Sequence, residues 1–222
     1  MKVLSRFSKG IRQAKALSFG LSAHTLCDVS CKLYNKGCYA ERPEAMYKNY
    51  YNKLIRHRRT LPENLVRLAR QEIDGLKWFR FSVSGSLPKK SAVKNWKAFA
   101  SELQGLCSEL LSNDCKVHLP VESMDKARSY RAILPNIVVR RTIQTERGLS
   151  SFNDSAAYVV GETPGKHNLE LSRELAQKKR EEGKSVVVCP AVFKNKFGEK
   201  SKCGKCTACA SPLVDLILYP LH

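Results

Sequence analysis

Short apolar runs alternate along the chain with longer stretches in which apolar residues recur every three or four positions. The short runs are rich in β-branched and aromatic side chains, and several end at glycine, serine or proline, which is typical of buried strands. This pattern predicts strands at residues 15–21, 78–83, 116–121, 136–143, 156–160, 185–188 and 213–219.

The longer stretches have the period of amphipathic helices. Within the first of them, Met46, Tyr50 and Leu54 repeat at every fourth position and would form one apolar face. A second helix is expected to begin at Pro62, because proline is favoured in the first helical turn. The predicted helices cover residues 42–59, 62–73, 96–111, 125–134 and 169–182.

The alternation of strands and helices predicts an α/β fold with a mostly parallel sheet. The number of strand–helix units suits a complete or partial (β/α) barrel better than a doubly wound sheet, and no GxGxxG motif follows the first strand. We therefore expect a barrel domain over residues 1–188 and a cysteine-rich segment with a final strand over residues 189–222. In a barrel, chemistry belongs at the carboxyl ends of the strands.

The chain is strongly basic. Of its 222 residues, 39 are Lys or Arg and 20 are Asp or Glu, which gives a formal net charge of +19. Such an excess favours a polyanionic partner, most often nucleic acid and less often an anionic membrane surface. The expected phosphate contacts are Arg56, Arg58, Arg59, Arg140 and Arg141, with a solvated helix face as the alternative for any one of them.

The amino end has no signal-peptide pattern, and no run of about 18 apolar residues occurs anywhere. The sequence therefore predicts a cytoplasmic protein without a membrane partner. Nine cysteines in a reducing compartment favour metal ligation over disulfides. Cys107 and Cys115 lie on or after an apolar helix and are expected to be buried structural thiols, which leaves seven candidate ligands.

The carboxyl-terminal cysteines form the most specific motif. Cys203, Cys206 and Cys209 follow one another as CxxCxxC, and Cys189 lies upstream, directly before a proline. Ferredoxin-type ligation of a [4Fe–4S] cluster uses the same run with a Cys-Pro as the remaining ligand. Zinc ribbons use two separated CxxC pairs instead, so zinc is the second choice here and a metal-free loop the third.

A second group, Cys27, Cys31 and Cys38, lies on the loop after the first predicted strand. Three thiolates leave one iron of a cubane without a protein ligand, and in radical enzymes built on barrels of this kind that iron binds S-adenosylmethionine. The usual spacing there is CxxxCxxC, so the third cysteine comes four residues late. A structural cluster, or a zinc site completed by His24 or a distant residue, is the alternative.

Five segments of the chain carry a family resemblance. They are the cysteine group ending in Cys38-Tyr39-Ala40, the strand at residues 80–85, Cys189-Pro190-Ala191, the CxxCxxC run, and the stretch at residues 219–222. In combination they resemble the gene product 88 family of phage- and plasmid-borne proteins. The segment that continues to Glu41 is also similar to a second phage family considered related to radical S-adenosylmethionine enzymes. This resemblance covers most of the chain, and it implies a bacterial host, a radical-enzyme-type barrel and one or two [4Fe–4S] clusters.

The same resemblance implies where S-adenosylmethionine would bind. Tyr39 follows the third cysteine, and Ser84, Gly85 and Ser86 end the second strand. The family pattern leads us to expect Gly-Asp where this chain has Gly85-Ser86, so one carboxylate is missing. Glu122, at the end of another strand, is a candidate for the ligand's amine, and a surface ion pair is the alternative for it.

We therefore expect an iron–sulfur protein of a mobile element, of radical S-adenosylmethionine type or a degenerate relative, acting on or near nucleic acid. The rival hypothesis is a non-catalytic, metal-stapled nucleic-acid-binding accessory protein of a phage or plasmid. A third is a zinc protein that binds a partner protein. The amino-terminal cysteine group separates the first two, because a binding module needs no ligand-deficient cluster.

Overall fold

Short apolar runs from across the chain form one sheet in the computed structural model, which describes residues 2–6, 14–17, 56, 59–81, 87–143, 145–161, 165–189 and 206–220. The strand order is β1-β2-β3-β4-β5-β6-β8-β7. β1 runs antiparallel to β2, and the seven strands from β2 onward are parallel. The strands are β1 (Leu4–Arg6), β2 (Ala14–Leu17), β3 (Trp78–Phe81), β4 (Lys116–Val121), β5 (Val139–Ile143), β6 (Ala156–Val160), β7 (Val186–Val188) and β8 (Leu216–Pro220).

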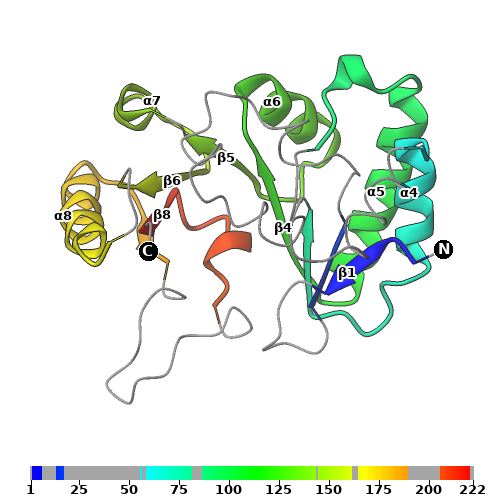
Figure 1. Cartoon of the computed structure of the whole chain (residues 1–222), viewed down its shortest axis with the longest axis horizontal. Coiled ribbons are helices and arrows are strands. Elements are labelled where there is room, and N and C mark those ends of the chain that lie inside the picture. Colours follow the sequence, from blue (N-terminus) through cyan, green and yellow to red (C-terminus); the bar gives the residue numbers. More distant parts are fainter. Residues whose placement is uncertain are drawn as a thin grey trace.

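The described helices lie on one side of this sheet (Figure 1). They are α4 (Pro62–Arg70), α5 (Trp96–Ser112), α6 (Met124–Ile133), α7 (Glu146–Ser150) and α8 (His167–Glu181), with short 3-10 turns η1 (Lys90–Ala92) and η3 (Ala208–Ala210). Asn95, Ser123 and Thr145 start α5, α6 and α7, and each side chain accepts a hydrogen bond from the backbone amide three residues later. None of the helices in the described part of the chain is long and apolar enough to cross a bilayer.

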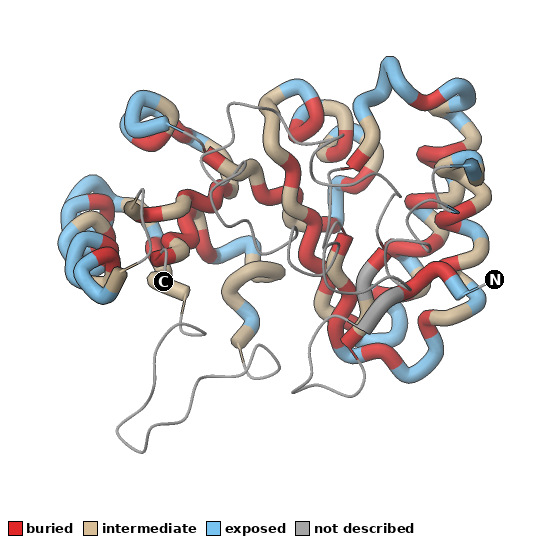
Figure 2. Tube along the Cα trace, in the orientation of Figure 1, coloured by how far each residue is buried: buried red, intermediate tan, exposed pale blue. Residues whose placement is uncertain are grey.

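The strand residues that point toward the helices are apolar and buried, and we call this side the helix face. They form two neighbouring core clusters, one under α4, α5 and α6 and the other under α7 and α8. Figure 2 shows the buried positions running along the strands and the inward sides of the helices. The strand residues of the helix face are Phe79, Phe81, Val117, Leu119, Val121, Val139, Ile143, Ala156, Tyr158, Val160, Val186, Leu216 and Leu218.

The α/β class and the parallel sheet predicted from the sequence are confirmed. Among the described residues the sheet does not close, since β1 and β7 are its edges, and this open form is consistent with a partial barrel. Three features were not predicted: strand β1, helix α7 and the position of β8, which lies between β6 and β7 instead of outside them. Apart from Arg56 and Arg59, the helix predicted at 42–59 lies outside the described residues.

Candidate functional site

The side of the sheet opposite the helices carries polar side chains, and we call it the polar face. Arg80 of β3 pairs with His118 of β4, and the pairing of β4 with β5 brings Arg140 to the same side. The register continues through β6 to Tyr219 of β8 and to Cys189, which directly follows β7. The polar face therefore presents basic, aromatic and thiol groups on neighbouring strands.

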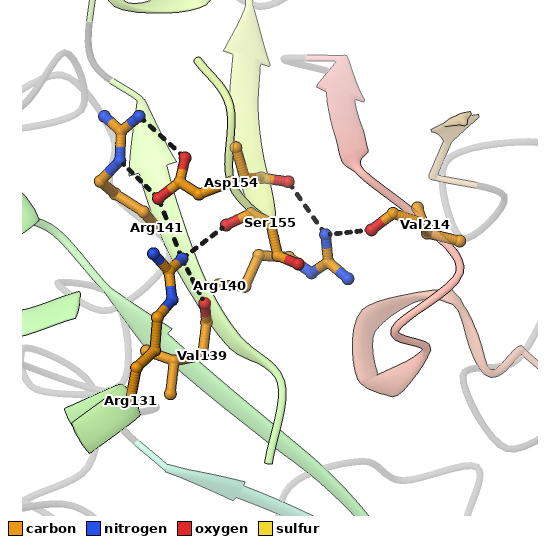
Figure 3. Close-up of polar contacts among 8 residues, drawn as sticks. Arg131, Val139, Arg140, Arg141, Asp154, Ser155 and Val214 are labelled. Carbon is orange, nitrogen blue, oxygen red and sulfur yellow. Dashed lines mark hydrogen bonds and ion pairs between the residues drawn. The ribbon is translucent and has the colours of Figure 1, made fainter. Parts of the chain in front are cut away.

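Arg140 is the centre of the polar face. Its side chain is 0% exposed, and its three nitrogens donate to main-chain carbonyls at 3.1 to 3.3 Å. These carbonyls belong to Ala156 of β6 and to Ala208, Cys209, Ser211 and Val214, and Figure 3 shows the contact to Val214. We call residues 206–215 the cysteine loop. Because a guanidinium is a planar fork of donors, these contacts fix the loop's position over the sheet.

One of the bound carbonyls is that of Cys209, whose thiol meets a residue of the sheet. The Cys209 sulfur lies 3.1 Å from the hydroxyl oxygen of Tyr219. Burial, and then the Cys209 sulfur beside it, raise the pKa of Tyr219 well above its ordinary value, so this hydroxyl keeps a proton to donate. Burial also raises the pKa of the Cys209 thiol, although Tyr219, Arg80 and Arg140 act in the opposite direction.

Two further cysteines belong to the same region. The backbone amide of Cys189 donates to the carbonyl of Leu218 at 2.8 Å, so Cys189 continues β7 beside β8. Its thiol is close enough to Tyr219 to influence the tyrosine electrostatically, as Cys206 influences Cys209. All three cysteines are partly exposed. The structure thus brings Cys189, Cys206 and Cys209 to one region of the polar face from two separate segments.

His118 lies among these cations and is 5% exposed. Burial, and then the positive charges of Arg80 and Arg140, hold the pKa of His118 well below its ordinary value of 6.5. The imidazole is therefore neutral at pH 7, and the region combines two permanent cations with a neutral base.

Arg141, the next residue along β5, points to the other side of the sheet. Its Nε and Nη2 atoms donate to the two carboxylate oxygens of Asp154 at 3.2 and 3.1 Å, and Arg131 of α6 reaches the same carboxylate at 2.9 Å (Figure 3). Burial raises the pKa of Asp154, but the hydrogen bonds from Arg141 and Arg131 outweigh it, and the pKa ends below its ordinary value. This group ties β5 to α6.

The predicted phosphate contacts therefore need correction at two positions. Arg140 is enclosed and engaged with carbonyls, and Arg141 is committed to Asp154, so neither offers its guanidinium to a phosphate. Arg56 and Arg59 are exposed, as a surface contact requires. The sequence alone does not reveal the difference, because adjacent arginines in a strand must face opposite ways and no pattern shows which side a loop will cover.

Of the other residues singled out in the sequence, some are described by the structure and the rest are not. Glu122 forms an ion pair with the buried Lys126 one helical turn later, which is the alternative that the sequence left open. Cys107 and Cys115 are buried, as predicted, and burial raises the pKa of each thiol to about 12. The remaining predicted site residues lie outside the described residues: Cys27, Cys31, Cys38, Tyr39, Arg58, Ser84, Gly85, Ser86 and Cys203.

Tyr219 and Arg80 are site residues that reasoning from the sequence missed as such. In β4 the alternation of Lys116, His118 and Pro120 with Val and Leu is a visible signal of a polar face. In β8 the run Leu-Ile-Leu-Tyr has no alternation, so nothing in it points Tyr219 toward a cysteine.

Two features of the described residues bear on ligand binding. Within the described residues, no three His, Cys, Asp or Glu side chains are already grouped as ligands of one metal ion. A cavity of about 220 Å³ opens at the amino ends of β4 and β5, lined in part by Cys115, Val117, Ile137 and Ala210, at the opposite strand ends from Cys189. Comparisons of the chain with protein-family models, with curated proteins and with solved structures find no match.

Proposed function

We propose that this chain is an iron–sulfur protein of a mobile element that works on or beside nucleic acid. In this proposal Cys189, Cys203, Cys206 and Cys209 hold a [4Fe–4S] cluster on the polar face of an open (β/α) barrel. Cys27, Cys31 and Cys38 hold a second cluster, whose open iron binds S-adenosylmethionine as in the radical enzymes that the sequence resembles.

The observation that carries the proposal is the attachment of the cysteine loop. Arg140 engages four carbonyls of this loop, including that of Cys209, and the thiol of Cys209 meets Tyr219. A loop with no function at its cysteines has no need of a buried cation beneath it, since burying a charge costs several kcal/mol before its hydrogen bonds offset that cost. Fixed backbone around a thiolate is what a metal centre requires of its surrounding residues.

The residues present suit the chemistry of the group. Thiolate sulfurs are the preferred ligands of iron–sulfur clusters, and an iron–sulfur cluster supplies one-electron transfer. Burial raises the pKa of the Cys209 thiol, and the positive charges of Arg80 and Arg140 beside it partly oppose that rise. The Tyr219 hydroxyl is positioned to donate a hydrogen bond to that sulfur. His118, held neutral, adds no further charge to the region.

Metal analysis tests the proposal most directly. Protein purified without oxygen is expected to be brown, to absorb near 400 nm, and to contain roughly four to eight irons with matching sulfide. Cys206→Ala should lower both the iron content and the melting temperature, because ligation contributes folding free energy. Cys107→Ala is the matched control, a buried thiol that should leave the iron content unchanged. Stoichiometric zinc without iron or sulfide would replace this proposal with the metal-stapled binding protein.

A second experiment separates an enzyme from a binding module. Reduced protein with both clusters should cleave S-adenosylmethionine slowly to 5′-deoxyadenosine, and Cys38→Ala should abolish the cleavage while Cys209→Ala reduces it less. Protein that carries its clusters yet neither binds nor cleaves S-adenosylmethionine would leave the non-catalytic nucleic-acid-binding protein as the better account.

A further inference from the structure

Four lysines follow one another closely in the sequence between β3 and the first turn of α5. Lys89, Lys90, Lys94 and Lys97 are all exposed, and residues 87–101 contain no Asp or Glu. We call residues 87–97 the lysine segment. In Figure 2 it forms part of the pale blue, exposed stretch beside α5.

The lysine segment is fixed to the rest of the protein by side chains that point inward. Leu87 and Val93 are buried in the core, and the hydroxyl of Tyr130 donates to the carbonyl of Pro88 at 2.8 Å. At its end Asn95 caps α5 through the amide of Ala98. The four ammonium groups are thus presented to solvent from an anchored backbone, which lowers the entropy that a partner must remove on binding.

Some cations elsewhere in the described chain pair with carboxylates. Arg70 pairs with Glu102 and Glu109, Lys126 with Glu122, and Lys179 with Glu182. By contrast, no ion pair among the described residues includes a lysine of the lysine segment. Like charges concentrated in one short stretch repel one another, and the repulsion is relieved when a polyanion binds and releases its own counterions.

We propose that the lysine segment binds the phosphate backbone of nucleic acid. This inference rests on the nucleic-acid part of the proposed function and assigns that contact to Lys89, Lys90, Lys94 and Lys97. An anionic membrane fits less well, because surface binding to lipid uses exposed apolar side chains beside the cations. The exposed large apolar residues of the described chain are Leu61, Leu111, Leu171 and Leu213, none of which lies in this segment.

The position of the lysine segment suits the same purpose. It follows the carboxyl end of β3 in the chain, and Cys189 follows the carboxyl end of β7, so both come after the carboxyl ends of parallel strands. A strand of nucleic acid bound by the lysine segment would therefore lie near the carboxyl ends of the strands, where barrel enzymes have their active sites.

Two charge-reversal variants of the full chain test the proposal. One changes all four lysines of the lysine segment to Glu, and the other makes the same change at four exposed lysines on other elements, Lys2, Lys77, Lys166 and Lys178. The two variants have the same net charge, so they differ only in where the charge is removed. Binding is measured by fluorescence anisotropy with labelled single-stranded DNA, single-stranded RNA and duplex DNA of about 20 nucleotides over a range of salt concentrations.

The lysine-segment variant should bind about tenfold to a hundredfold more weakly than the wild type near 0.1 M salt, and the slope of log K against log salt should fall by roughly 3 to 4. The control variant should change affinity by less than about threefold, and both should keep the wild-type melting temperature. Equal losses in the two variants would overturn the assignment while leaving nucleic-acid binding intact. A wild type that binds none of the three probes would instead remove nucleic acid from the proposed function. Binding to anionic lipid vesicles is measured in parallel. If the lysine-segment variant loses vesicle binding but keeps its affinity for all three nucleic acids, the segment binds a membrane and the proposal is overturned.

Discussion

The helix face and the polar face are built from the same strands, yet they are stabilised by different interactions. On the helix face, residues such as Phe79, Leu119 and Leu218 are fully buried, and each contributes about 2 kcal/mol through loss of apolar surface to water. On the polar face, a single arginine holds a loop through hydrogen bonds of defined direction.

The comparison shows that the helix face supplies most of the folding stability, whereas the polar face holds particular atoms in defined positions. Apolar burial has no direction, so the helix face can adjust by small shifts without losing its contacts. Hydrogen bonds weaken steeply when their geometry changes, so the polar face holds the backbone of Cys209 in one place. We therefore expect substitutions on the helix face to change stability alone, and loss of the Arg140 contacts on the polar face to change stability together with metal content.

The largest effect on stability is expected on the helix face. Phe79→Ala should lower the free energy of unfolding by about 4 kcal/mol, because it removes a buried ring and leaves a cavity. Urea denaturation measures the loss, and iron per folded chain should not change. Loss of iron in folded Phe79→Ala protein would show that the two faces are not independent.

Arg140→Met should cost about 3 kcal/mol, because buried carbonyls lose their donor. It should also lower iron per folded chain, since the cysteine loop is no longer fixed. Arg140→Lys should be nearly as unstable and as poor in iron as Arg140→Met, because an ammonium group cannot reproduce the planar fork of donors. Arg141→Met is the control on the opposite face and should leave iron unchanged. Full iron content in folded Arg140→Met protein would contradict a positioning role for Arg140.

Asp154→Asn should destabilise the protein by about 2 kcal/mol at pH 7, through the contacts with Arg141 and Arg131. The pKa of Asp154 is lowered in the folded state, so the carboxylate's contribution is present above its ordinary value of 3.8 and is lost as the pH falls below it. Denaturation of wild type and variant at several pH values should show the difference closing below about pH 4. A constant difference would mean that charge is not its source.

His118 gives the polar face a pH dependence in a higher range. In the unfolded chain its imidazole gains a proton as the pH falls through 6.5, whereas the folded protein keeps it neutral. The unfolded state then binds more protons, so stability should fall below pH 6.5 by up to about 1.4 kcal/mol per pH unit. His118→Gln should flatten this part of the curve. An unchanged slope would place the pH dependence on other groups.

Tyr219→Phe should have the smallest effect, a loss of about 0.5 to 1 kcal/mol from the contact with the Cys209 sulfur. If that sulfur is a cluster ligand, the variant should also shift the visible absorption or the reduction potential without changing iron content, because hydrogen bonds to ligand sulfurs tune such clusters. An identical spectrum and potential would separate Tyr219 from the cluster.

Much of the fold was predictable because it depends on local patterns. The strands Lys116–Val121 and Ala156–Val160 and the start of α4 at Pro62 follow from apolar runs, turn residues and proline geometry. Strand β1 was missed because it is three residues long and contains Ser5 and Arg6, and α7 because it is a single short turn after Thr145. The insertion of β8 between β6 and β7 is a long-range pairing, and no local pattern encodes it.

The candidate site was predictable in its cysteines and not in their surroundings. The CxxCxxC spacing can be read from the sequence itself. It is informative because ligation of one cluster requires closely spaced thiolates. The role of Arg140 depends on which loop crosses the polar face, and only the three-dimensional arrangement shows that. The lysine segment was hidden for a related reason, since a count of charges does not tell paired cations from unpaired ones.

The insertion of β8 has a consequence for the order of assembly during synthesis on the ribosome. β6 and β7 leave the exit tunnel before β8, so β6 can pair with β5 on one side only, and β7 has no native neighbour among the described strands until β8 has emerged. Until then both strands expose an open edge, which is the kind of surface that pairs with other chains. Before β8 can pair with β7, the long loop from Cys189 to the start of β8 must close, and closing this loop costs chain entropy. A metal drawn between Cys189 and Cys209 would shorten that connection to a few residues, so metal supply would govern how long the nascent sheet remains prone to aggregation.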